Sequence, residues 1–267
     1  PQMDQMSVLV YDGPFSDHVR SHSPRALTGP EVGAREAEGI ALRFVAGGES
    51  EGSGRAEIVT ETGPDAPIAA WRVQVETESG PVYVVDVAKQ GGHVLWMLQN
   101  ELREPAEATH SLADAIAIAQ AFLGARGFRG FEVSYAAVEQ GRAIVPFVYV
   151  EDGVLIYPDQ VKVTVALDRG TVVGFDGMQY YSFHHDRTLP TPSLAEHEAL
   201  QRLHPSLQPE TVRLALIPRP DLKEVLTYEV RARANDMLYH VYINAQSGEE
   251  EQILRIIESD DRGTMAI

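Results

Sequence analysis

The sequence predicts an α+β protein of three consecutive units, each with one helix packed on an antiparallel sheet of about four strands. Three observations predict it: a strand-turn-strand pattern that occurs three times, a helix signal ahead of each occurrence, and strand-like runs between the two. The glycines that close the pattern, Gly92, Gly170 and Gly248, are 78 residues apart both times. Such a period suits small domains and is too long for a solenoid repeat.

Each copy of the pattern alternates apolar, mostly β-branched residues at a period of two and then reaches a polar turn that ends in glycine. This order of residues is typical of a β-hairpin, because glycine adopts positive φ without strain. A second short strand follows each turn. The three first strands with their turns are 85–92, 163–170 and 241–248, and the second strands are 94–97, 172–175 and 252–254.

Each helix signal resembles a capping box, in which two side chains satisfy free backbone amides at the helix start. The three pairs are Thr28 with Glu31, Ser111 with Asp114, and Ser193 with Glu196. The second copy carries the most regular apolar stripe, from Leu112 to Leu123, and is expected to end at Gly124 or Gly127.

The remaining predicted strands lie between each helix and its hairpin, and proline-rich stretches separate the units. We expect a lead-in segment of unassigned role at 1–26, followed by units at 27–105, 106–190 and 191–267. The strand-like runs are 56–60, 69–77, 131–138, 144–150, 212–217 and 225–232, and the linkers are 105–109 and 189–192.

Composition excludes several functional classes. The chain has 22 Lys and Arg against 39 Asp and Glu, a formal charge of −17, which disfavours nucleic acids and anionic lipid surfaces as partners. The absence of cysteine excludes thiolate zinc sites, thiol nucleophiles and disulfides. The longest apolar runs are too short to span a bilayer. Because the chain opens at Pro1, we expect that an N-terminal piece was removed, together with any signal or anchor.

Histidines provide the most ligand-like cluster, His184-His185-Asp186. Neighbours on a strand point to opposite faces and cannot bind one ion together without a turn, so this segment is expected to be a polar segment at the end of the second unit rather than a metal site. His197 and His204 lie seven residues apart without a carboxylate to complete a zinc triad, so we expect surface histidines. No metal and no cofactor are predicted.

Carboxylates leave one enzymatic alternative open, because glycoside hydrolysis needs only two acids at a suitable distance, one with a raised pKa. Glu249-Glu250-Glu251 is expected on a solvated edge strand, and Asp152, Asp159 and Asp168 at turns or strand ends. Serine-hydrolase, phosphate-loop and zinc-protease motifs do not occur in the sequence. We therefore predict no catalytic residue and keep a carboxylate-dependent peptidoglycan hydrolase as the alternative.

The candidate residues for binding a partner are Tyr180, Tyr181, Phe183, His184 and His185, just ahead of the second linker. In an extended chain, one face would place Tyr181 and Phe183 in the core while Tyr180 points outward. Core packing is the favoured role for these aromatic residues. The same holds for Trp96 and Tyr157, although aromatic anchors are enriched at interfaces.

The residues that fill these units resemble a known family. The segment from Asp152 to Val163, running on to Phe175, closely resembles the C-terminal region of the YpeB germination proteins of spore-forming bacteria. The helix-plus-sheet unit is similar to the PepSY domain. Further matching segments, in order along the chain, are 96–100, 184–187, 212–218, 242–245 and 248–251.

This resemblance implies a non-enzymatic protein that binds, stabilises and restrains a SleB-like cortex-lytic enzyme in the dormant spore. It implies a location at the outer face of the inner spore membrane or in the cortex, through an N-terminal anchor absent from this chain. Cortex peptidoglycan is a further candidate partner. A general PepSY peptidase inhibitor and a plain glycan-binding module remain alternatives to the enzyme partner.

Overall fold

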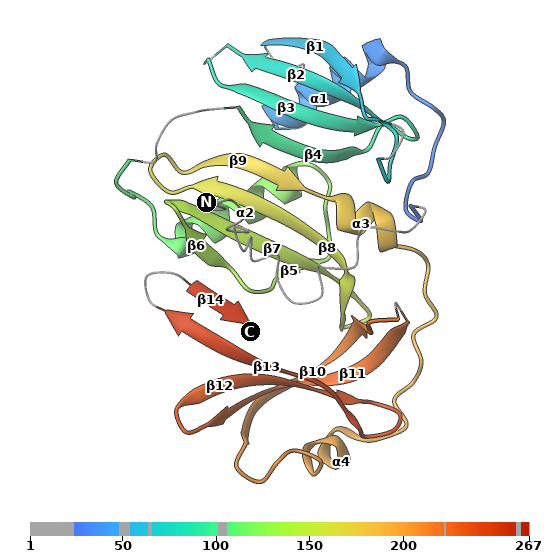
Figure 1. Cartoon of the computed structure of the whole chain (residues 1–267), viewed down its shortest axis with the longest axis vertical. Coiled ribbons are helices and arrows are strands. Elements are labelled where there is room, and N and C mark those ends of the chain that lie inside the picture. Colours follow the sequence, from blue (N-terminus) through green and yellow to red (C-terminus); the bar gives the residue numbers. More distant parts are fainter. Residues whose placement is uncertain are drawn as a thin grey trace, which may run out of the picture.

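The computed structural model describes residues 24–47, 54–63, 66–78, 80–100, 106–221 and 223–256, with the backbone of 257–259 and 263–266. The predicted α+β class is confirmed: helices lie on a largely antiparallel sheet. Figure 1 shows three groups of strands stacked along the long axis, in chain order from blue to red. None of the described helices has the length and apolar character needed to span a membrane.

The first group consists of one helix and a four-stranded antiparallel meander. The second has a helix and five strands, and a short helix follows it. The third has a short helix and five strands. In chain order the elements are α1 (Ala34–Ala46), β1 (Gly54–Glu61), β2 (Ala70–Thr77), β3 (Val82–Ala88), β4 (Val94–Gln99); α2 (Leu112–Ala125), β5 (Phe131–Val133), β6 (Ala137–Glu139), β7 (Arg142–Glu151), β8 (Val154–Ala166), β9 (Thr171–Asp176), α3 (Met178–Phe183); α4 (Glu196–Leu200), β10 (Gln208–Pro218), β11 (Glu224–Ala234), β12 (Met237–Asn244), β13 (Glu250–Ser259) and β14 (Gly263–Ala266).

The three groups join edge to edge into one 14-stranded sheet. Strands β4 and β9 pair antiparallel, with Met97 opposite Phe175, and β8 and β10 pair parallel, with Leu155 opposite Ala215. These bonds cross both predicted unit boundaries. The boundaries themselves stay a prediction.

Two faces of the sheet are buried in different ways. Helices α1 and α2 pack side by side on one face, where Phe44 and Phe122 meet edge to face at 5.7 Å between ring centroids. The third group is covered by α4 on one face, and on the other it packs against the second group through Tyr135, Leu155 and Tyr242. The second group is therefore in contact with both of the others.

The predicted helix starts have mixed outcomes. The capping box at Ser111 is confirmed: the Asp114 amide donates to Ser111 Oγ at 3.2 Å, and the Ser111 amide donates to Asp114 Oδ2 at 2.9 Å. The prediction of a capping box at Thr28 and Glu31 is wrong, because α1 begins at Ala34 and has no side-chain cap. Backbone bonds hold that segment extended against the β3–β4 turn, and Glu31 forms a bridge with Gln90.

The third predicted helix is shorter than the others. Ser193 does not cap it, because the Ser193 amide donates to the Ala245 carbonyl and α4 begins only at Glu196. Its start is held by Glu198, whose carboxylate accepts from the Ala195 amide at 2.7 Å.

The predicted strands appear, with one interruption. The run 131–138 divides into β5 and β6 at Ser134–Ala136, opposite Pro146 of β7. Proline has no amide to donate, so the ladder is broken there, although the Ser134 amide still donates to the Pro146 carbonyl at 2.9 Å. The linker at 189–192 is irregular as predicted. Residues 1–23 of the lead-in, and residue 105 of the first linker, lie outside the described residues.

Candidate functional site

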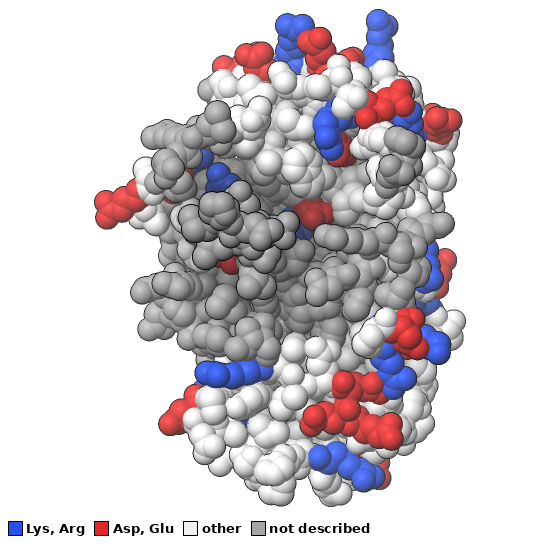
Figure 2. Space-filling view, in the orientation of Figure 1, with Lys and Arg blue, Asp and Glu red and all other residues white. Residues whose placement is uncertain are grey.

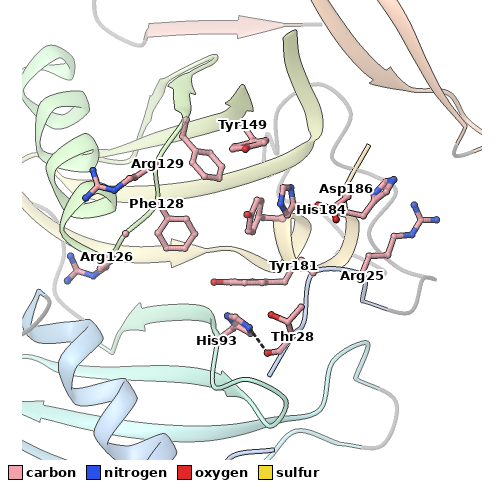
Figure 3. Close-up of a pocket in the computed structure, with 15 residues that line it drawn as sticks. Arg25, Thr28, His93, Arg126, Phe128, Arg129, Tyr149, Tyr181, His184 and Asp186 are labelled. Atoms are coloured by element: carbon pink, nitrogen blue, oxygen red, sulfur yellow. Dashed lines mark hydrogen bonds between the residues drawn. The ribbon is translucent and has the colours of Figure 1, made fainter. Parts of the chain in front are cut away.

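A pocket of about 740 Å³ lies where the first group, the second group and α3 meet (Figure 3). Its wall comes from the segment before α1, the β3–β4 turn, the loop after α2, strands β5 and β7, and α3 with the residues that follow it. Among the described residues that line the pocket, six carry basic groups, five are aromatic and one is acidic. These are Arg25, His93, Arg126, Arg129, His184 and His185; Phe128, Phe131, Tyr149, Tyr180 and Tyr181; and Asp186.

Helix α3 places two of the aromatic residues, Tyr180 and Tyr181, in this pocket. Asp176 begins the helix by accepting from the Met178 amide at 2.9 Å. The predicted extended conformation of Tyr180–Phe183 is wrong, because these residues belong to α3 and successive side chains point about 100° apart rather than to opposite faces. The segment before α1 is fastened to α3 by the Ala26 amide, which donates to the Tyr181 carbonyl at 3.1 Å.

The aromatic rings form one continuous wall. The ring of Tyr180 stacks on His184 at 4.5 Å and meets Phe131 edge to face at 5.4 Å. Burial raises the pKa of the Tyr180 hydroxyl to about 12, so it is a neutral donor at physiological pH. Burial also raises the pKa of Tyr181, which is 8% exposed.

The Arg126 side chain connects the two long helices beneath this wall. Its guanidinium donates to the Phe44 carbonyl at 2.7 Å, to the Val45 carbonyl at 3.3 Å and to the Phe122 carbonyl at 2.9 Å. It therefore satisfies free carbonyls at the end of α1 while belonging to the end of α2. Burial lowers the pKa of Arg126 to about 10.

Behind the wall lies an ion cluster that joins the second and third groups. Asp159 is fully buried and accepts two bonds from Arg187, at 2.7 and 2.8 Å, and one contact from His184 Nδ1 at 2.6 Å. Arg187 also donates to Glu224 of β11, at 2.7 and 3.0 Å. Burial by itself would lower the pKa of Arg187, but its bonds to Glu224 and Asp159 raise it above its ordinary value.

The prediction that Asp159 lies at a turn or strand end is wrong. It lies inside β8, at a wide bulge where Val148 pairs with Gln160 and Tyr149 pairs with Ile156, which leaves 157–159 without partners on β7. The bulge points Asp159 toward Arg187, and Tyr157 toward the third group. Asp152 does lie in a turn, with φ of 48°.

A second buried polar cluster lies between the second and third groups. Tyr157 donates to Glu229 Oε2 at 2.5 Å, and His240 Nδ1 lies 3.5 Å from the other oxygen of Glu229 and 2.7 Å from the hydroxyl of Tyr135. Burial alone would raise the pKa of Glu229, but His240 and the hydroxyls of Tyr157 and Tyr242 outweigh it and lower the pKa.

Four of the predicted partner-binding residues, Tyr180, Tyr181, His184 and His185, line the pocket, and Phe183 does not. Their role in binding stays a prediction. Sequence reasoning missed the basic residues opposite them. The one local signal for these is Arg126-Gly-Phe-Arg-Gly-Phe131, which interleaves cations with aromatic residues directly after α2.

The remaining predicted residues are dispersed. His197 and His204 are exposed, and so are Glu249 and Glu250. Glu251 departs from the solvated position expected of it, because it is held by Arg219 and by the Asn244 amide, the latter at 2.6 Å. Within the described part of the chain, no group of three or more histidine or acidic side chains is placed to hold a metal ion.

A helix laid on an antiparallel sheet and repeated along the chain defines a PepSY-type protein. The family model described as "Peptidase propeptide and YPEB domain" matches residues 191–253, and the model described as "YpeB sporulation, PepSY1 and PepSY2 domains" matches residues 1–190. The chain belongs to the YpeB sporulation protein family.

Two curated relatives agree with this assignment. The sporulation protein YpeB of Halalkalibacterium halodurans is 35% identical over 245 residues, which cover 92% of this chain and 53% of that protein. The protein of the same name from Bacillus subtilis is 31% identical, over 86% of this chain and 50% of its own length. The chain therefore spans about half the length of the curated relatives it matches.

A solved structure has the same fold. The C-terminal domain of YpeB from Bacillus megaterium superposes with a TM-score of 0.75 at 28% sequence identity, over 85% of this chain and 99% of that one.

Proposed function

We propose that this chain is the non-catalytic part of a spore protein that binds, stabilises and restrains a SleB-like cortex-lytic enzyme in the dormant spore. The observation that carries the proposal is the family match, which runs along 92% of the chain to a relative named as a sporulation protein. The enzyme partner, and a location at the outer face of the inner spore membrane or in the cortex, are our inference from the resemblance to the germination proteins.

The chemistry of the buried acids supports a binding role over a carboxylate-dependent hydrolase. A glycosidase general acid needs a raised pKa, whereas hydrogen bonds and the nearby His240 lower the pKa of Glu229 despite its burial. Both oxygens of Asp159 accept from Arg187 in the interior. Glu229 and Asp159 therefore stabilise the packing between the second and third groups rather than act as a catalytic pair.

The charge of the chain supports a basic surface on the partner. The net charge is −17, and Figure 2 shows acidic side chains spread over the described parts of this face among basic ones rather than gathered in one patch. A field of this kind speeds the encounter with a cationic protein and is screened by salt.

The test is co-elution of the purified chain with the cortex-lytic enzyme at low and moderate salt, together with a cortex-lysis assay. We expect a complex that weakens as salt rises and an enzyme whose lytic rate falls when the chain is present. Absence of both a complex and inhibition refutes the proposal. Release of muropeptides from cortex fragments by the chain alone refutes it in favour of the hydrolase.

The same assay tests the predicted partner-binding residues. Phe183→Ser removes a half-buried aromatic ring outside the pocket, and Val59→Ser is the control, because Val59 is an exposed apolar residue on β1, 59% exposed. We expect Phe183→Ser to weaken the complex and Val59→Ser to leave it unchanged. Equal complexes from both variants remove Phe183 from the binding surface.

A further inference from the structure

We propose that the pocket between the first two groups and α3 binds a saccharide that carries a carboxylate group. This goes beyond the proposed function, because it concerns a small ligand that is recognised without the enzyme partner. The volume of about 740 Å³ falls within the roughly 300–1,000 Å³ of small-molecule sites and can enclose a short saccharide.

The cationic side of the pocket is available to a ligand. Arg25 and Arg129 are exposed and come from opposite walls, one from the segment before α1 and one from the loop after α2. Among the residues that the structure describes, neither guanidinium has a carboxylate within ion-pair distance. Guanidinium groups bind carboxylates in a planar, bidentate manner, so a carboxylate is the anion that these two residues fit.

The two histidines are oriented by bonds on the far side of their rings. His184 uses Nδ1 to contact Asp159 at 2.6 Å, and His185 uses Nδ1 to contact the Phe183 carbonyl at 2.7 Å. Among the described residues, the Nε2 atom of each ring has no hydrogen-bond partner, so it is available to a ligand hydroxyl. Since Asp159 is fully buried and fixed by Arg187, the direction of the His184 ring is set before any ligand arrives.

The aromatic wall gives the reason to expect a sugar ring. Figure 3 shows the rings of Phe128, Tyr149 and Tyr181 around one hollow, with the basic side chains at its rim. A pyranose ring has an apolar C–H face and a rim of hydroxyl groups. It can lay the C–H face on aromatic rings while its hydroxyls reach His184, His185 and Thr28.

A matched pair of sugars tests the proposal on the full chain. N-acetylmuramic acid and N-acetylglucosamine share a ring, and only the former carries a carboxylate. We expect the acid to bind at least about tenfold more tightly by calorimetry, the value of one charged hydrogen bond, and to bind less tightly as salt rises. Saturation-transfer NMR with selective irradiation of the aromatic protons of the protein should show transfer to the ring protons of the sugar.

Two variants of equal charge change locate the site. Arg129→Gln should weaken binding of the acid about tenfold and leave the neutral sugar unaffected. Arg255→Gln is the control, since Arg255 is exposed on β13, outside the pocket. Circular dichroism and the melting temperature check that both variants fold.

Three results overturn the proposal: equal affinity for the two sugars, equal binding by the two variants, or binding of a glutamate-rich peptide with no binding of either sugar. The last result assigns the pocket to an acidic peptide instead. None of these outcomes affects the proposed enzyme partner, because the measurement contains no enzyme.

Discussion

Removing the guanidinium of Arg187 should be among the most destabilising single changes in this chain. The side chain is 3% exposed and donates two bonds to Asp159, which is itself fully buried. In Arg187→Met the carboxylate of Asp159 keeps only its contact with His184 and has no route to solvent. The other partner, Glu224, is 23% exposed and can turn toward water, so its lost bonds contribute less.

The magnitude follows from the two bonds to the buried acid. Each hydrogen bond to a charged group contributes about 1.5–3 kcal/mol, so two give about 3–6 kcal/mol. Breaking a buried ion pair by removing one partner costs about 3–5 kcal/mol, which agrees. At roughly 2–4 °C per kcal/mol for a protein of this size, the melting temperature should fall by roughly 6–20 °C.

Urea denaturation and calorimetry measure this loss, and a control is available. Arg213 also joins the second and third groups, through Glu132 at 2.8 Å, but these side chains are 42% and 50% exposed. Arg213→Met should therefore change the free energy of unfolding by no more than about 1 kcal/mol. Replacing Asp159 and Arg187 together by leucine and methionine should recover part of the loss. If Arg187→Met unfolds like Arg213→Met, the cluster does not hold the groups together.

Three further predictions concern other parts of the fold. Arg126→Leu should lower the free energy of unfolding by about 2–4 kcal/mol, because three carbonyls at the ends of α1 and α2 lose their donor. Amide hydrogen exchange should then become faster first at those two helix ends. Unchanged exchange contradicts this prediction. Because the pKa of Glu229 is lowered in the folded state, this residue should contribute its full stabilisation at pH values above its ordinary pKa of 4.5. The contribution should be lost as the pH falls through the pKa of the folded state, so Glu229→Gln should make the stability fall less steeply at acidic pH. An equally steep fall in the variant contradicts this prediction. Gly91→Ala should destabilise the fold strongly, because φ is +74° and a Cβ would lie 1.9 Å from the Thr28 carbonyl oxygen. Gly153→Ala is the control, because its φ of +81° is similar but the space around it is open, so it should cost only the backbone strain. Equal melting temperatures of the two variants contradict the steric argument.

Features set by near neighbours in the chain could be predicted from the sequence. The capping box of Ser111 and Asp114 needs only two side chains three residues apart and a helix between them. Thr28 and Glu31 have the same spacing, but no helix forms there because the segment pairs with the β3–β4 turn, some sixty residues away. A capping pattern therefore predicted a helix start only where no distant strand edge competed for the same amides.

The candidate site was predicted only in part, for a similar reason. The aromatic and histidine residues of 180–185 are contiguous, so they stood out as a cluster. The basic residues across the pocket belong to three other segments, and only packing of the first group against the second brings them within reach. Likewise Tyr157-Pro158-Asp159 has turn-like composition and does leave β7, but as a bulge inside a strand.

The sequence by itself determined the repeated helix-and-hairpin order and the α+β class, because alternation, capping and glycine turns depend on residues a few positions apart. It also determined the family, because the matching segments occur in order along the chain. The tertiary structure alone decided how the three sheets join edge to edge, which acids are buried, and that arginines from separate segments face one aromatic wall. Such contacts depend on the pairing of strand edges and on loop packing between residues that lie 28 to 82 positions apart in the chain, where desolvation and ion pairing act between side chains that no local pattern connects.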